Sequence, residues 1–217
     1  FKWDYVHAFY YFSDAMKRTD VLADLAEGQP DQDTAEMLRD YYRQSDSAEP
    51  RNALMQLAMR TQLSEEFLFM TDRFSMAHSL EARVPFLDHT FVETVMRIPS
   101  QIRTKPGDPK YLLRQAVKDL LPSELLHAPK RGFVIPTAQW LRGPLRPLAE
   151  RLLAPKRLAA QGLFRPEFYA RFVQPHLEGQ ADYHPQVWTA LMFQVWHSLY
   201  LELALTDCPN FSWQELC

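Results

Sequence analysis

The chain has 217 residues, of which 47% are hydrophobic and 24% are charged, and its formal net charge at pH 7 is -3. This length and composition suit one domain, or one domain with a subdomain, that buries a real core. The charge balance argues against nucleic acid as the main partner, because no basic block is longer than a pair. Cys208 and Cys217 lack C-x-x-C spacing, which favours a reduced, cytoplasmic protein without an implied disulfide.

Helix signals dominate the first third of the chain. Residues 1–18 carry aromatic and apolar side chains at helical spacing, and Asp20 is expected to cap a short helix that stops at Gly28. Further helix starts are predicted at Asp33 or Thr34, at Pro50 and at Ser64. The sequence begins at Phe1 without an initiator methionine, and we expect it to be a fragment of a longer protein.

The remaining sequence predicts short helices joined by proline-rich connections. Asp88 should cap a helix that Pro99 closes, and Asp108-Pro109 should open the helix of 110–121. Residues 186–205 are apolar enough to span a bilayer but contain polar residues, so we expect a buried core helix. Alternating patterns are nearly absent, and the predicted fold class is mostly α. Further helices are expected to begin near Ser123, Thr137, Leu145, Arg165 and His184.

Several familiar kinds of site are missing from the sequence. All six glycines are isolated, so no glycine-rich loop is present to cradle a nucleotide phosphate. The seven histidines show neither H-x-x-x-H nor H-E-x-x-H spacing, and no metal site is predicted. No G-x-S-x-G elbow is present for a serine nucleophile.

The stretch "SLEARVPFLD", residues 79–88, places three charges around a proline. Pro85 should hold the preceding residues in an extended conformation, which puts Glu81 and Arg83 on one face. Phe86 and Leu87 are then expected to anchor the loop in the core and to hold Glu81 at a pocket wall. The alternative is a partly buried ion pair that only fixes the loop.

A second loop, "KRGF", contains Lys130 on a glycine turn. Gly132 permits a positive φ, so Lys130 could be aimed at a fixed anion. The alternative is a solvated basic turn. Asp72 on the upstream helix could reach the same region, or it is a surface acid beside Arg73.

Three ordered blocks, "TDRFSMAHSLEARVPFLD", "KYLLRQAVKDLLP" and "KRGFVIPTAQWL", together resemble the C-terminal half of the synthetase domain of glutamine-dependent asparagine synthetases. β-Lactam synthetase and related amide-forming enzymes share this pattern. The resemblance is firm over residues 68–141, and it implies that residues 1–217 are the helical C-terminal portion of the domain. The implied whole is an α/β PP-loop ATP pyrophosphatase domain whose parallel sheet is largely missing from this chain.

The resemblance also implies a reaction and site residues. In that family, ATP activates a carboxylate as an acyl-adenylate, which ammonia from a glutaminase domain or an internal amine attacks. Glu81 matches a glutamate that positions or deprotonates the attacking nitrogen, and Lys130 matches a lysine that stabilises negative charge. Arg83 and Asp88 also match the family motif, and we interpret them as supporting residues, with Arg83 orienting Glu81 and Asp88 capping its helix. Two further basic residues, Lys110 and Arg114, match as possible anion contacts.

Other family features are absent from this sequence and are expected upstream of Phe1. They are the S-G-G-x-D-S pyrophosphate loop, the D-E-L-F segment with a magnesium ligand, and the glutaminase cysteine. At Ala128 many relatives carry a basic residue. ATP and Mg²⁺ are implied for the full-length enzyme, with none bound by this chain alone, which should be inactive.

The expected partners are the upstream α/β half, the glutaminase domain and a small carboxylate substrate, which the resemblance implies is aspartate. A homo-oligomer is left open, and neither nucleic acid nor a membrane is expected as a partner. Two alternatives to an asparagine synthetase remain. One is an amidotransferase acting on another acceptor. The other is a non-catalytic helical interaction module that binds through Trp3, Phe9, Tyr10 and Tyr11.

Overall fold

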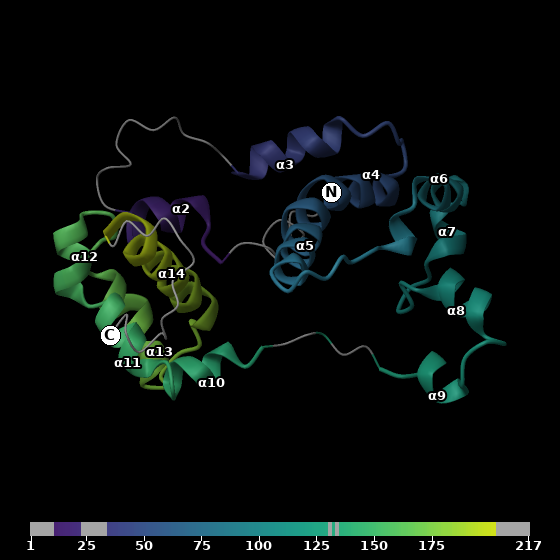
Figure 1. Ribbon diagram of the computed structural model, residues 1–217. Coiled ribbons are helices and arrows are strands. Elements are labelled where there is room, and N and C mark those ends of the chain that lie inside the picture. Colours follow the sequence, from purple (N-terminus) through teal and green to yellow (C-terminus); the bar gives the residue numbers. More distant parts are fainter. Residues whose placement is uncertain (1–10, 23–33, 130–131, 133–134, 203–217) are drawn as a thin grey trace. The chain divides into compact units, whose positions relative to one another are not determined.

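The structure, a computed structural model, describes residues 11–22, 34–129, 132 and 135–202 (Figure 1). The predictions for residues 1–10, for 23–28 and for 203–205 at the end of the apolar segment therefore lie outside the described residues. The described residues form helices and loops without a strand, and their only extended pairings are two isolated bridges. The predicted mostly helical class is therefore confirmed.

The described residues divide into two compact units. The first comprises those between 34 and 132, and the second combines 11–22 with 135–202. The first unit contains α3 (Thr34–Arg43), α4 (Pro50–Ala58), the π-helix Met59–Leu68, α5 (Phe69–Met76), the 3-10 turn Pro85–Leu87, α6 (His89–Arg97), α7 (Ser100–Arg103), α8 (Tyr111–Val117) and α9 (Ser123–Leu126).

Most helix starts in the first unit agree with the sequence, and two do not. Ser64 does not begin a helix, because the backbone is helical from Pro50 to Met76 and the Ser64 hydroxyl donates to the carbonyl of Thr61 at 3.3 Å. α8 begins at Tyr111 rather than at Pro109. Residues 105–108 form a turn before the helix, in which the Asp108 N–H donates to the Lys105 carbonyl. Gly107 has φ 78°, the positive φ that a type II turn requires at its third residue.

The second unit contains the remaining helices. They are α2 (Asp14–Met16), the π-helix Lys17–Val21, α10 (Thr137–Arg142), α11 (Arg146–Leu152), α12 (Pro155–Gln161), the π-helix Tyr169–Val173, α13 (Gln174–Leu177), α14 (His184–His197) and the π-helix Ser198–Glu202. The expectation for Asp20 is wrong: it lies within the π-helix Lys17–Val21, and its carboxylate pairs with Arg171 instead of capping a helix start.

The second unit has an apolar core to which each of its longer helices contributes. Helices α10 to α14 gather around it (Figure 1). Phe168 and Phe172 are fully enclosed, with ring centroids 5.0 Å apart, and Phe12 packs on both. α14 buries Val187 and Leu191, so the apolar segment supplies a core helix as predicted. Within the described ranges, no helix is long and apolar enough to cross a membrane.

The first unit buries very little apolar surface. Among its described residues, Ala53 and Leu57 are the buried apolar side chains, and the other buried residues are Ser100 and Arg103. Helices α6 to α9 succeed one another along the chain (Figure 1), and none of their described apolar side chains is buried. Large apolar side chains are exposed on almost every element of the unit: Met37, Met55, Phe67, Phe69, Met70, Phe74, Met76, Leu80, Val84, Phe86, Phe91, Ile102, Leu113, Leu120, Leu121 and Leu125.

His176, on α13, is a fully buried titratable group in the second unit. Arg142 donates from Nε to the His176 carbonyl at 2.9 Å and from Nη2 to the ring Nδ1 at 3.3 Å. The ring Nε2 has no hydrogen-bond partner among the described residues. Burial, together with the charge of Arg142, lowers the pKa of His176, although Asp182 at 3.5 Å opposes the shift. The folded state therefore favours the neutral form of His176 more than the unfolded state does.

We expect the second unit to lose stability as the pH falls through the ordinary histidine range. The pKa of His176 is lower in the folded than in the unfolded chain, so its contribution is fully present above about pH 6.5 and declines below that value as the unfolded state binds the extra proton. Urea unfolding at pH 7.5 and pH 5.5 measures this, with His176→Gln as the control that cannot titrate. An equal pH response in both proteins would contradict the assignment.

Candidate functional site

A distinct backbone turn ends α5 and starts the 79–88 loop. The N–H of Ser79 donates to the Met76 carbonyl at 2.9 Å, and the N–H of Leu80 donates to the Ser75 carbonyl at 3.0 Å. These two bonds form a Schellman motif, in which the residue after the helix adopts a left-handed conformation. Ser79 has φ 56°, and it is the non-glycine residue with positive φ in the described part of the chain. The chain leaves the helix sharply at this point.

Glu81 and Arg83 form the ion pair that the sequence predicts. Arg83 Nη2 lies 2.5 Å from Glu81 Oε1, so both side chains share one face of the loop. Their side chains are 66% (Glu81) and 84% (Arg83) exposed, so the pair is not partly buried. An exposed pair of this kind contributes about 0–1 kcal/mol to stability. The pair therefore adds little to holding the loop.

The expected core anchor of the loop is wrong within the described structure. Phe86 is 62% exposed and Leu87 is half-buried. Phe86 packs edge-on against Phe91 of α6, with ring centroids 5.7 Å apart, and the first unit offers it no buried apolar layer. The loop is instead held by backbone geometry at both of its ends.

Asp88 closes the far end of the loop, as the sequence predicts. Its carboxylate accepts a hydrogen bond from the Phe91 N–H at 3.1 Å and so caps α6. Just before it, Pro85 starts a 3-10 turn in which the Leu87 N–H donates to the Val84 carbonyl at 2.9 Å. Residues 80–84 therefore run between two capped helices.

The basic residues around α8 form a second group in the first unit. Arg114 Nε lies 3.5 Å from Asp108 Oδ1, which also accepts from the Lys110 N–H at 3.2 Å. Lys110 exposes its side chain, and Lys105 lies over the Tyr111 ring at 4.7 Å from the centroid. Arg114 thus shares its charge with an acid of its own segment. The Pro106-Gly107 dipeptide in the sequence predicts a turn, and that turn brings Lys105 next to Tyr111.

The remaining predicted site residues lie elsewhere. Asp72 is exposed on α5 and has no ion-pair partner in residues 34–129. Its neighbour Arg73 stacks on the Phe69 ring and does not pair with Asp72. Lys130 lies outside the described residues, so its convergence with Glu81 stays a prediction. Of the proposed aromatic contact face, Tyr11 is described and is 55% exposed. No group of three His, Cys, Asp or Glu that could hold a metal occurs in the ranges that the structure describes.

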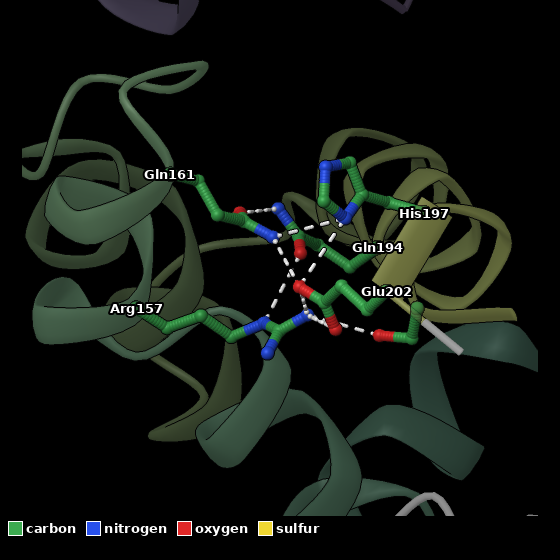
Figure 2. A network of polar contacts seen from close by, with 6 residues as sticks. Arg157, Gln161, Gln194, His197 and Glu202 are labelled. Atoms are coloured by element: carbon green, nitrogen blue, oxygen red, sulfur yellow. Dashed lines mark hydrogen bonds and ion pairs between the residues drawn. The ribbon is translucent and has the colours of Figure 1, made fainter. Parts of the chain in front are cut away.

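The second unit holds a polar network that the sequence did not single out. Figure 2 shows Arg157 and Gln161 of α12 meeting three residues from α14 and the π-helix after it. Arg157 Nη2 lies 2.8 Å from each Glu202 carboxylate oxygen, and its Nε donates to Gln194 Oε1 at 3.3 Å. Gln194, which is fully buried, donates to Gln161 Oε1 at 2.7 Å.

The network satisfies its own polar groups and leaves no free nucleophile. Arg157 also donates to the Ser198 hydroxyl at 2.9 Å, and His197 Nδ1 lies 3.3 Å from Glu202 Oε1. The hydrogen bonds from Arg157 lower the pKa of the Glu202 carboxyl. Polar residues at 194, 198 and 202 recur every four positions, which was the available signal for one shared helix face. The network joins α12 to the end of α14.

Comparison with known proteins identifies the chain's relatives. The Asparagine synthase family model matches residues 4–198. "Asparagine synthetase [glutamine-hydrolyzing] 1" of Bacillus subtilis (strain 168) is 29% identical over 167 residues, which is 77% of this chain and 26% of that protein. "Asparagine synthetase [glutamine-hydrolyzing]" of Gallus gallus is 33% identical over 144 residues, which is 58% of this chain and 26% of that protein. No solved structure matches.

The chain therefore belongs to the asparagine synthase family, because the family model covers most of it. It spans about a quarter of the length of these curated relatives. The predicted resemblance is confirmed at the level of the family.

We expect Arg157→Met to destabilise the second unit. The substitution keeps most of the side-chain volume but removes the donor to the buried Gln194 amide oxygen, at a cost of about 1–3 kcal/mol. Arg151→Ala is the matched control, because Arg151 is exposed on α11, and it should change the free energy of unfolding by less than about 0.5 kcal/mol. Urea denaturation measures both, and equal values would show that the network contributes nothing.

Proposed function

We propose that this chain is the helical C-terminal part of an ATP-dependent amide-forming ligase. In this proposal the enzyme activates a carboxylate, aspartate by analogy with its relatives, as an acyl-adenylate that ammonia released from glutamine then attacks. The family match and the activity for which the relatives are named support this proposal. Residues 1–217 would form the C-terminal portion of an α/β PP-loop domain, in the cytoplasm, and an acceptor other than aspartate remains the alternative.

The geometry of the 79–88 loop is the observation that carries the proposal. The loop holds Glu81 and Arg83 in one ion pair, is fixed by helix caps at both ends and leaves both side chains open. Because an exposed pair adds little stability, the contribution of the pair to folding does not explain why Glu81 and Arg83 stand at these positions. A carboxylate held in a fixed position and left accessible suits a group that meets a substrate.

The exposed apolar side chains of the first unit support the proposed upstream partner. Phe74 is 65% exposed and Leu120 is 78% exposed, and burying a side chain of this size contributes about 1.5–3 kcal/mol. A continuous sheet supplied by the upstream α/β half would cover many such residues at once. We propose that this half, joined to a glutaminase domain, binds the first unit.

In the proposed reaction, Glu81 accepts a proton from the attacking nitrogen, and Arg83 orients its carboxylate. Lys130 stabilises the negative charge that develops on the acyl group, and that role rests on its place in the sequence. Asp88 holds the loop through its cap on α6. Three further residues are supporting contacts in this proposal: Asp72, Lys110 and Arg114.

ATP and Mg²⁺ do not fit the described residues as a binding site. The described part of the chain offers neither a glycine-rich phosphate loop nor a cluster of acids for a metal. We therefore assign the binding of both to the upstream half and derive no step through them here. This division is the reason for proposing that the two halves act together.

The proposed partnership predicts gain of activity on reconstitution. The chain alone should show no ATP–pyrophosphate exchange with aspartate, whereas co-expression with the upstream part of the Bacillus subtilis relative should give exchange. Phe74→Asp should weaken co-purification at least about tenfold, because the charge replaces a side chain that would become buried. Lys156→Asp, exposed on α12, is the control. Exchange by the chain alone, or tight binding to an unrelated protein instead, would contradict the proposal.

The site assignment predicts loss of amide formation in the reconstituted enzyme. Glu81→Gln should lower the rate by about 10²–10⁴, since a proton acceptor is lost, and Lys130→Ala by about 10²–10³. Glu93→Gln and Lys118→Ala alter exposed residues of the same unit and should leave the rate near that of the unaltered enzyme. Circular dichroism checks that each variant stays folded. Near-normal rates for Glu81→Gln and Lys130→Ala would remove both from the site.

A further inference from the structure

The direction of the Glu81 loop depends on the backbone at Ser79. Every side chain from Leu80 to Phe86 is exposed, so packing within the described unit does not set the path of this segment. What sets it is the Schellman turn at one end and the Pro85 turn with the Asp88 cap at the other. Glu81 follows two residues after the left-handed residue, so a change in φ at Ser79 swings its carboxylate directly.

Serine is an unusual choice for this position. Glycine is the usual residue at the left-handed position of a Schellman motif, because any other residue there has a Cβ that lies close to the following carbonyl. At Ser79 the chain accepts that cost and also confines the backbone, since a serine visits fewer conformations than a glycine. The turn is therefore both strained and restricted at the entrance to the loop.

From this geometry we propose that Ser79 is a positioning residue, whose left-handed backbone sets where Glu81 stands relative to the attacking nitrogen. The inference rests on the proposed function, because it acts through the role of Glu81. It requires nothing of the serine hydroxyl. The required property is a residue that accepts positive φ, which glycine and asparagine share and β-branched residues do not.

The first arm of the test uses this chain alone and measures amide hydrogen exchange. Ser79→Val should speed exchange of the Ser79-position and Leu80 amides roughly tenfold, because valine disfavours the turn that protects them. Ser79→Gly and Ser79→Asn should retain the protection. Ser64→Val, the same change in helical backbone, should leave the Leu80 amide unaffected. Unchanged protection in Ser79→Val would overturn the inference, whatever the enzyme does.

The second arm uses the complex of this chain with the upstream part of the Bacillus subtilis relative, and it separates the two half-reactions. Ser79→Val should lower amide formation about tenfold or more while ATP–pyrophosphate exchange is retained, and Ser79→Gly and Ser79→Asn should restore it. In a Glu81→Gln background, Ser79→Val should cause no further loss, because Ser79 acts through Glu81.

If the losses of amide formation multiply when Ser79→Val and Glu81→Gln are combined, Ser79 has a general structural role and the inference is overturned. The same conclusion follows if Ser79→Val lowers amide formation and ATP–pyrophosphate exchange equally. Absence of exchange in the unaltered complex would instead refute the proposed function. In that case the hydrogen-exchange arm still decides whether Ser79 sets the turn. The two failures are therefore distinguishable.

Discussion

Burial of apolar side chains is the constraint on which this structure depends, and it is distributed unequally between the two units. The second unit encloses a core of aromatic and aliphatic residues around Phe168, Phe172 and Leu191. The first unit encloses Ala53 and Leu57 as its described buried apolar residues and leaves its large apolar side chains open. A helical unit with so little buried area gains little hydrophobic stabilisation from its own packing. We propose that the upstream half of the family's domain covers these exposed side chains.

The candidate site lies in the unit with the smaller core, and its form is set by backbone chemistry. Ser79 ends one helix with two hydrogen bonds, Pro85 constrains the residue before it, and Asp88 caps the next helix. Such local devices work without a surrounding core, because their partners lie within a few residues. This explains how a loop with exposed side chains can still hold a defined path.

Charged groups serve different purposes in the two units. In the second unit, Arg142 and Arg157 reach across helices and satisfy buried carbonyl and amide groups, which a dry interior requires. In the first unit, Arg103 is buried against Asn52 and methionine sulfurs, and its Nε has no hydrogen-bond partner in the described residues. The ion pair of Glu81 and Arg83 is open to solvent and leaves its carboxylate accessible.

The sequence by itself determined the helical class, the helix starts at Thr34 and Pro50, the cap at Asp88, the pairing of Glu81 with Arg83, and the family resemblance. These features depend on residues close together in the chain, so local patterns and short motifs report them. Only the tertiary structure decided that Phe86 is exposed, that Asp20 pairs with Arg171 and that Arg157 binds the end of α14. Those contacts join residues far apart in the chain or depend on which surface is covered, and no local pattern specifies either of these.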